Sequence, residues 1–264
     1  MLRIIDQGRA GIIAQQTRLD AVANNLANVN TTAFKRQEVS FADLLYQEMN
    51  AAGRPVEKEN PAAAGPAHGA GAKAAAAAKN FAGGALITTN RALDLAIAGD
   101  GFFQVELPDG RLAYTRSGAF NVAADGTLVQ DNGYPVAPGI ALPENYREVT
   151  IRFDGAVLAA GGAEGAGGPQ EAGRIALYRF INPQGLAAIG DNLYLATPAS
   201  GEPVEGTPGE GGFGVIRQGC LEASNVDLTR EMAALIETQR GAQLALRMVQ
   251  NADEMWNIAN NLRK

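Results

Sequence analysis

The sequence is poor in the residues that carry most enzyme and metal chemistry. Its 264 residues include one cysteine, Cys220, and one histidine, His68. A single cysteine excludes an internal disulfide, and a structural zinc site needs four closely spaced cysteine or histidine ligands. His68 lies in a stretch of Ala, Gly and Pro, where no neighbouring residue would orient it for proton transfer. We therefore expect no catalytic residue, no metal site and no cofactor.

Long apolar runs and clusters of positive charge are also missing. No segment approaches the roughly 20 apolar residues that cross a bilayer. Asp6 and Arg9 interrupt the first residues before the apolar core of a signal peptide can form. The net charge is -6 and the sequence has no run of Lys or Arg, whereas neutralising phosphates needs a basic stripe. These absences predict a protein without membrane insertion, without a cleaved signal peptide and without nucleic-acid binding.

Proline is confined to the middle of the chain, and both ends carry apolar residues at seven-residue spacing. This spacing is typical of a helix that packs against another helix. The first repeat comprises Ile5, Ile12, Leu19 and Leu26, with Val22 and Val29 on the same side. The last repeat comprises Leu228, Leu235, Ala242, Val249 and Trp256, joined by Met232 and Leu246. The pattern predicts two long helices, the second capped by Asp227, that bury their stripes against each other or against another copy of the chain.

The middle of the chain changes to the period-two pattern of β-strands. Between Leu86 and Ile216, short apolar runs flank the turn pairs Asp109-Gly110, Asp125-Gly126 and Asp154-Gly155, which predict three hairpins. The Gly- and Ala-rich residues 159–173 are predicted to form a loop between strands.

The segment before these strands is rich in Ala, Gly and Pro and has few large apolar residues, which is typical of a linker. Within it, the run of Ala74–Ala78 favours a helix by propensity, although so short a helix is marginal without packing. The expected fold is α+β, with a discontinuous, coiled-coil-like helical assembly domain (1–31 with 224–264), a linker or extended arm (32–84) and a mostly antiparallel all-β central domain (85–219).

Three longer motifs follow one another along the chain. They are ANNLANVNTTAFKR at 23–36, LDLAIAGDGFFQV at 93–105 with YTRSGAF at 114–120, and LEASNVDLTREMAALIETQR at 221–240. Together they resemble the signatures of the axial proteins of the bacterial flagellum, the rod and hook family. The FADLLYQ segment at 41–47 and the chain length are most similar to the distal rod members. The chain departs from the family at Gly241-Ala242, where members often carry an Ala-Tyr pair.

The resemblance implies a non-enzymatic structural subunit of the flagellar basal body. Such a subunit would polymerise with copies of itself into a hollow shaft that transmits torque. Implied partners are itself, other rod subunits, the hook protein and, where an outer membrane is present, the bushing ring proteins. The implied location is the rod in the periplasmic space, reached through the flagellum's own export apparatus.

The assembly interface implied by the resemblance lies on the helical arms. We expect it to include the apolar repeat residues Ile5, Ile12, Leu19, Val22, Leu26, Val29, Leu228, Met232, Leu235, Leu246, Val249 and Trp256. The amides of Asn24, Asn25 and Asn28 lie beside the apolar stripe, and any of them that becomes buried must hydrogen-bond a neighbour or the backbone.

Two alternatives remain open from the sequence. The chain can be another rod subunit of the same family, such as a proximal one. It can also be a surface- or carbohydrate-binding β module with helical oligomerisation ends, for which Phe102, Phe103, Tyr114 and Tyr134 are the candidate contact aromatics.

Overall fold

The chain forms two spatial units. The structure is a computed structural model that describes residues 2–262, apart from 45–46, 49–54, 58–59, 62–66, 70, 144–145 and 162–169. The first unit comprises residues 1–27, 37–78 and 227–264, and the second comprises residues 28–36 and 79–226. Each unit is therefore discontinuous in sequence.

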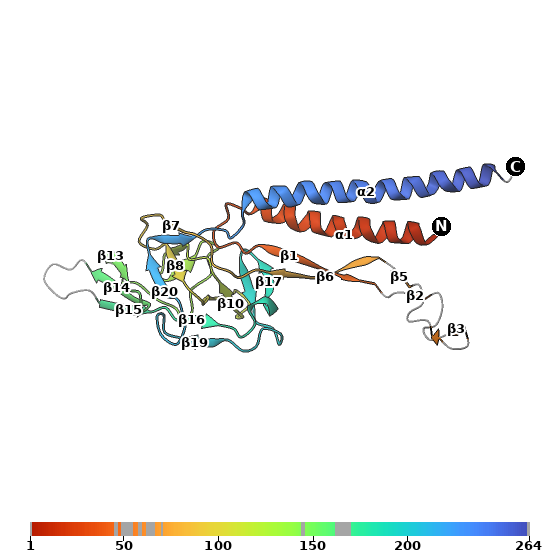
Figure 1. Ribbon diagram of the computed structural model, residues 1–264. Coiled ribbons are helices and arrows are strands. Elements are labelled where there is room, and N and C mark those ends of the chain that lie inside the picture. The colour runs from red at the N-terminus through yellow and green to blue at the C-terminus, as the bar shows by residue number, and fades with distance from the viewer. Residues whose placement is uncertain are drawn as a thin grey trace. The chain divides into compact units, whose positions relative to one another are not determined.

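Two long helices dominate the first unit (Figure 1). Helix α1 (Leu2–Ala27) and helix α2 (Leu228–Asn261) lie side by side with the two chain ends at the same end of the pair. The prediction that Asp227 caps the second helix is confirmed. Its carboxylate Oδ1 accepts hydrogen bonds from the backbone N–H groups of Thr229 at 2.9 Å and Arg230 at 3.2 Å, two of the donors that a helix start leaves without partners.

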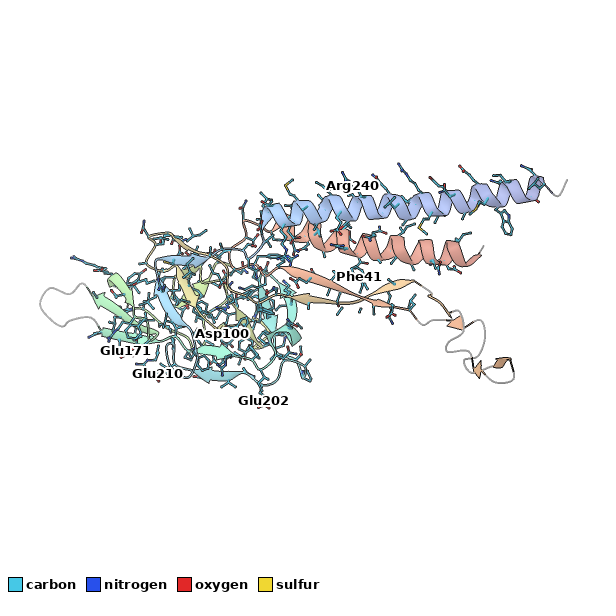
Figure 2. All side chains as sticks on the ribbon, in the orientation of Figure 1. Phe41, Asp100, Glu171, Glu202, Glu210 and Arg240 are labelled. Carbon is cyan, nitrogen blue, oxygen red and sulfur yellow. The ribbon has the colours of Figure 1, made fainter. Side chains whose placement is uncertain are left out.

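A β-ribbon completes the first unit. Strand β1 (Gln37–Asp43) pairs with β6 (Ala72–Lys79), and two short pairs follow, β2 (Gln47–Glu48) with β5 (Ala67–His68) and β3 (Pro55–Glu57) with β4 (Asn60–Pro61). The helical preference of Ala74–Ala78 is overridden, because β1 supplies these residues with hydrogen-bond partners that an isolated short helix would lack. Phe41 projects half-exposed from β1 (Figure 2), while the side chain of His68 lies outside the described part of the chain.

The second unit is built from short strands joined by tight turns. In chain order they are β7 (Leu86–Thr88), β8 (Leu95–Ala98), β9 (Phe103–Glu106), β10 (Leu112–Thr115), β11 (Phe120–Val122), β12 (Leu128–Gln130), β13 (Tyr146–Ile151), β14 (Ala156–Gly161), β15 (Gln170–Arg174), β16 (Leu177–Arg179), β17 (Ala187–Gly190), β18 (Leu193–Leu195), β19 (Val204–Gly206), β20 (Val215–Gln218) and β21 (Cys220–Glu222), with one 3-10 turn at Pro183–Gly185. They form the sheets β17-β18-β10-β9 and β13-β14-β15 and the pairs β11-β12, β16-β19, β20-β8 and β21-β7. The predicted α+β fold with an antiparallel β region is confirmed.

The three predicted hairpins are confirmed as β9–β10, β11–β12 and β13–β14. Gly110, Gly126 and Gly155 each adopt a positive φ at the turn, as a tight antiparallel connection requires.

The prediction of a loop over residues 159–173 is wrong at both ends. Strands β14 and β15 enter this segment and pair with each other, because small residues can occupy a strand when a neighbouring strand completes their hydrogen bonds. Residues 162–169 between them lie outside the described residues.

The core of the second unit is aromatic as well as aliphatic. Phe102, Tyr114 and Tyr194 belong to one buried cluster, and Phe103 is fully buried in the larger aliphatic one. Tyr134 packs against a third cluster. The proposal of Phe102, Phe103 and Tyr114 as exposed contact aromatics is therefore wrong, because edge-to-face packing holds these rings inside, as with Phe103 on Phe120 at 5.2 Å between centroids.

A buried ion pair ties the first and last segments of the second unit together. The Lys35 ammonium donates to Glu222 Oε1 at 2.6 Å and to the Ala82 carbonyl at 2.9 Å, and both charged side chains are almost completely buried. Glu222 also accepts from the backbone N–H of Gly84 at 2.8 Å. Burial lowers the pKa of Lys35 and the Glu222 carboxylate opposes this shift. The segment that leaves α1 is thereby joined to strand β21, which precedes α2.

The Asn225 side chain makes a second connection between these segments, with uncharged groups. Its side-chain oxygen accepts from the backbone N–H of Arg36 at 2.8 Å, and its amide nitrogen donates to the carbonyls of Asn80 and Ala82 at 2.8 and 3.0 Å. One amide therefore links three stretches of chain that are far apart in sequence.

Removing one partner of the buried pair is expected to destabilise the second unit strongly. Glu222→Gln leaves the Lys35 ammonium buried without a carboxylate, which we expect to lower the free energy of unfolding by about 3–5 kcal/mol. Urea unfolding followed by the near-ultraviolet circular dichroism of the tyrosines measures this. The control is Glu237→Gln, which removes the exposed Arg18–Glu237 pair and should change stability by less than about 1 kcal/mol. Equal effects of the two substitutions would contradict the assignment.

Tyr194 provides a second test within the same core. Its buried hydroxyl has no hydrogen-bond partner among the described residues, and burial followed by the charge of Glu222 raises its pKa. Tyr194→Phe is expected to raise the stability by about 1 kcal/mol at neutral pH. The unfolded phenol loses its proton near pH 10 while the folded one keeps it, so wild-type stability should fall as pH rises through about 10.

In urea titrations at pH 7 and pH 11, Tyr194→Phe should lose less stability between the two pH values than the wild type does. Tyr114→Phe is the matched control, because the Tyr114 hydroxyl accepts a hydrogen bond from Gln104 at 3.2 Å and its removal should destabilise. A loss of stability in Tyr194→Phe at pH 7 would show that its hydroxyl is bonded.

Candidate assembly interface

Helices α1 and α2 pack antiparallel in a regular register. A methyl group added to Gly8 would meet Val249, one added to Gly11 would meet Ala245, and one added to Gly241 would meet Gln15. Residues further along α1 therefore contact residues that come earlier in α2. Continuing this register brings Leu2 beside about Glu254, so the last two turns of α2 extend past the described start of α1.

The seam between the two helices is made of small and polar residues. Gly8 and Gly11 face α2, and Thr238 and Ala252 are buried on α2. A hypothetical Cβ at Gly8 would lie 2.6 Å from Val249 Cγ2, which is far inside van der Waals contact. Because small side chains allow close approach of the helix axes, the seam has little room for large ones.

Polar contacts fix the register of this seam. The buried Asn25 amide donates to the Gln37 carbonyl at 2.9 Å and to Glu231 Oε2 at 3.3 Å, and its oxygen accepts from the Gln37 N–H at 2.8 Å. One side chain therefore connects α1 with both β1 and α2. Further along the pair, Arg18 meets Glu237 at 3.1 Å. The buried Thr238 hydroxyl donates to the Ala234 carbonyl of its own helix at 2.6 Å.

The structure places the predicted interface residues in three environments. Fully buried within the chain are Val22 and Asn25. Partly buried are Ile12, Leu19, Leu26, Asn28, Val29, Leu235 and Val249. Exposed are Ile5, Asn24, Leu228, Met232, Leu246 and Trp256. Most large apolar residues of α2 thus lie outside the seam. The seam includes Val249, which the heptad pattern singled out, and small residues such as Gly8, Gly11 and Ala245, which it did not.

The two other predicted asparagines are placed differently from Asn25. Asn24 is exposed on α1, whereas Asn28 follows the helix and accepts a hydrogen bond from the Thr31 hydroxyl at 3.1 Å. The Asn28 carbonyl also accepts from the Thr31 N–H at 3.2 Å, which closes a turn where the helix ends.

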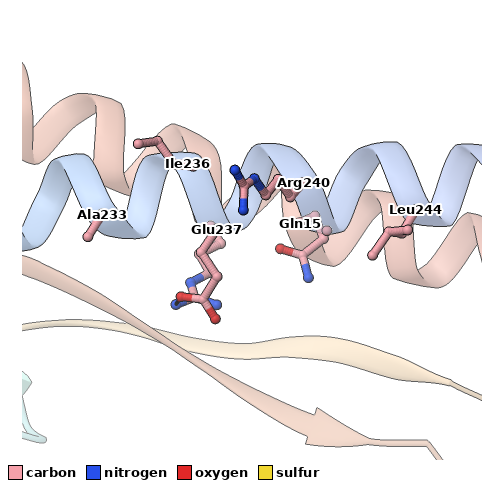
Figure 3. Close-up of a pocket in the computed structure, with 8 residues that line it drawn as sticks. Gln15, Ala233, Ile236, Glu237, Arg240 and Leu244 are labelled. Atoms are coloured by element: carbon pink, nitrogen blue, oxygen red, sulfur yellow. Dashed lines mark hydrogen bonds and ion pairs between the residues drawn. The ribbon is translucent and has the colours of Figure 1, made fainter.

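An open groove runs along one side of the helix pair. It has a volume of about 590 Å³ and is lined from α1 by Gln15 and Arg18 and from α2 by Ala233, Ile236, Glu237, Arg240, Gly241 and Leu244. Figure 3 shows Gln15 of α1 with Glu237 and Leu244 of α2 along this side. Gly241 keeps the groove open, because a Cβ there would press on the Gln15 amide at 3.1 Å. Sequence reasoning missed the groove, since its residues belong to no single heptad position.

The described residues offer little to other kinds of chemistry. No group of three or more His, Cys, Asp or Glu side chains in this part of the chain is arranged to hold a metal ion. Within the same residues, neither helix combines the length and apolar character that crossing a bilayer requires.

Sequence comparison identifies the class of protein to which this helix pair and β unit belong. Three family profiles match in order along the chain: "Flagella basal body rod protein" over residues 5–35, "Flagellar hook protein FlgE/F/G D1 domain" over 96–159 and "Flagellar basal body rod FlgEFG protein C-terminal" over 217–262. The first and last profiles cover the two helices and the central one covers strands of the β unit. All three describe axial subunits of the bacterial flagellum.

Sequence identity to full-length relatives shows which member of this class the chain resembles. The chain is 42% identical to the flagellar basal-body rod protein FlgG of Borreliella burgdorferi, with 100% of both chains covered. It is 41% identical to the FlgG of Caulobacter vibrioides over 96% of this chain and 97% of that one. The FlgF of the same organism is less similar, at 33% identity over 94% of each chain. The chain belongs to the family of the flagellar basal-body rod protein FlgG, the non-enzymatic structural subunit of the distal rod.

The close approach at Gly8 is testable with a neighbouring glycine as control. Gly8→Ala improves helix propensity but forces the added methyl group against Val249, a β-branched side chain that cannot rotate away freely. We expect a net loss of about 1–3 kcal/mol from overpacking.

Gly11→Ala meets only ordinary contact, 3.9 Å from the Ala245 Cβ, so helix propensity should prevail and stabilise by up to about 1 kcal/mol. Thermal melting followed by far-ultraviolet circular dichroism measures both variants. Stabilisation by both substitutions would disprove the tight seam.

Proposed function

We propose that the chain polymerises with copies of itself through its helix pair, forming the hollow shaft of the distal rod that transmits torque. The helical assembly domain comprises residues 1–31 and 224–264, the β domain comprises 85–219, and residues 32–84 form the arm between them. The predicted apolar repeat residues and Asn24, Asn25 and Asn28 contribute to this interface, the buried Val22 and Asn25 by holding the helix pair in place and the exposed residues by direct contact.

One observation carries this proposal. The seam between α1 and α2 is closed by small side chains, and large apolar residues such as Leu228, Met232, Leu246 and Trp256 stay exposed on α2. A soluble monomer rarely exposes so many large apolar side chains along one helix, and such surfaces usually mark a protein interface. These side chains are about half exposed, so burying the rest of each one in a polymer would contribute about 1 kcal/mol.

The family supports partners and a place in the cell for this shaft. Membership of a rod protein family supports assembly with other rod subunits. We infer further contacts with the hook protein at the end of the shaft and with bushing ring proteins where an outer membrane is present. We also infer residence in the periplasmic part of the basal body and export through the flagellum's own apparatus without a cleaved signal peptide.

Leu246→Glu tests self-assembly through the helices. Leu246 is 50% exposed, so a glutamate is tolerated in the monomer, but burying its charge against a neighbouring copy is costly. We expect the concentration at which the purified chain polymerises to rise by at least about tenfold, equivalent to about 1.4 kcal/mol. Sedimentation velocity over a concentration series measures this.

Gln243→Glu is the matched control, because Gln243 is exposed on the side of α2 that faces away from α1. It should polymerise like the wild type. A wild-type chain that stays monomeric at every concentration, even when added to basal bodies that lack this subunit, would overturn the proposal.

A further inference from the structure

Helix α2 carries two exposed apolar strips on opposite sides of its seam with α1. Successive residues of a helix turn by about 100°. Ala245 faces α1, so Leu246 points to one side of the seam and Leu244 to the other. On the side of Leu246 lie Leu228 and Leu235, which we call the heptad face. On the side of Leu244, next to the groove, lie Met248, Met255 and Leu262, which we call the groove face.

Both strips are exposed to a similar degree. On the groove face, Leu244 is 62%, Met248 53% and Leu262 84% exposed, against about half for Leu228 and Leu246 on the heptad face. Each strip covers the same length of helix, about 27 Å at 1.5 Å per residue. Leu228, Leu246 and the groove-face residues stay exposed beside the seam, whereas Leu235 of the heptad face is partly buried.

Two exposed charges of opposite sign lie near the strips. Arg240 lines the groove (Figure 2), together with the Arg18–Glu237 ion pair, and Asp253 lies on the side of the heptad face, seven residues beyond Leu246. Neither Arg240 nor Asp253 makes an ion pair within the described residues. The groove that Gly241 keeps open adjoins the groove face at Leu244, the residue that the two share.

The strips occupy different stretches of α2. The heptad face runs from Leu228 to Leu246, near the start of the helix, whereas the groove face runs from Leu244 to Leu262, at its end. A second copy in the same orientation that matched its heptad face to this groove face would therefore be displaced along the helix axis by about 24 Å.

We infer that the groove face of one copy binds the heptad face of a second copy of this chain, and that this staggered contact builds the shaft. The inference rests on the proposed function and specifies its contact. Because two different surfaces meet, the interface is heterologous and each bound copy offers the next one a free surface. The displacement along the axis favours an open helix over a closed flat ring.

Two variants distinguish this contact from any other mode of self-association. Met248→Glu disables the groove face and Leu246→Glu disables the heptad face. Gln243→Glu is the control, because Gln243 belongs to neither face. All three positions are exposed, so far-ultraviolet circular dichroism and melting of the full-length variants should match the wild type. Each disabled variant alone should sediment as a monomer at concentrations at least about tenfold above the wild-type threshold.

An equimolar mixture of the two disabled variants decides the matter. One intact groove face then meets one intact heptad face, so the mixture should form a 1:1 dimer and nothing larger. A mixture that stays monomeric, dimers of Leu246→Glu alone, or polymerisation of Met248→Glu at the wild-type threshold would each overturn the inference. The last two results leave the proposed function standing, whereas a wild-type chain that never polymerises defeats both.

Discussion

The close approach of α1 and α2 over glycine and small side chains is the constraint on which the rest of the structure depends. Gly8, Gly11 and Gly241 lie where the helices meet, and a methyl group added at Gly8 or Gly241 would press on Val249 or Gln15. The large side chains of α2 are displaced to its flanks. A helix pair that is satisfied internally can thus still present apolar surface to other molecules, which is what a polymerising subunit needs.

The second constraint is the way the chain enters and leaves its β unit. Lys35 and Glu222 form a buried ion pair, and the Asn225 side chain bonds to two distant backbone stretches, at Arg36 and at Asn80 with Ala82. The segments that lead out of α1 and into α2 are therefore tied to each other. Strand pairing reinforces the connection, because the last strands β20 and β21 pair with the first strands β8 and β7. Buried charge-assisted hydrogen bonds resist the separation of these segments.

Local sequence patterns were sufficient where local physics decides the structure. Asp227 caps a helix because its carboxylate reaches the next backbone N–H groups, and Gly110 turns a hairpin because it adopts a positive φ. The prediction of a loop over residues 159–173 failed where a partner strand decides. Residues 156–161 pair with 170–174, and Ala74–Ala78, whose helical preference is marginal, lies in a strand, because hydrogen bonds from a neighbour outweigh weak intrinsic preferences.

The sequence by itself determined that two amphipathic helices bracket an antiparallel β unit, since the apolar periods of seven and two are properties of the chain alone. It also carried the motifs of the flagellar axial family. Only the tertiary structure decided which side of each helix is used internally. The heptad pattern does not predict that Ala245 contacts α1 while Leu244 and Leu246 stay exposed. That outcome depends on glycines of α1, which are far from Ala245 in sequence, and on the bonds of Asn25 to Gln37 and Glu231.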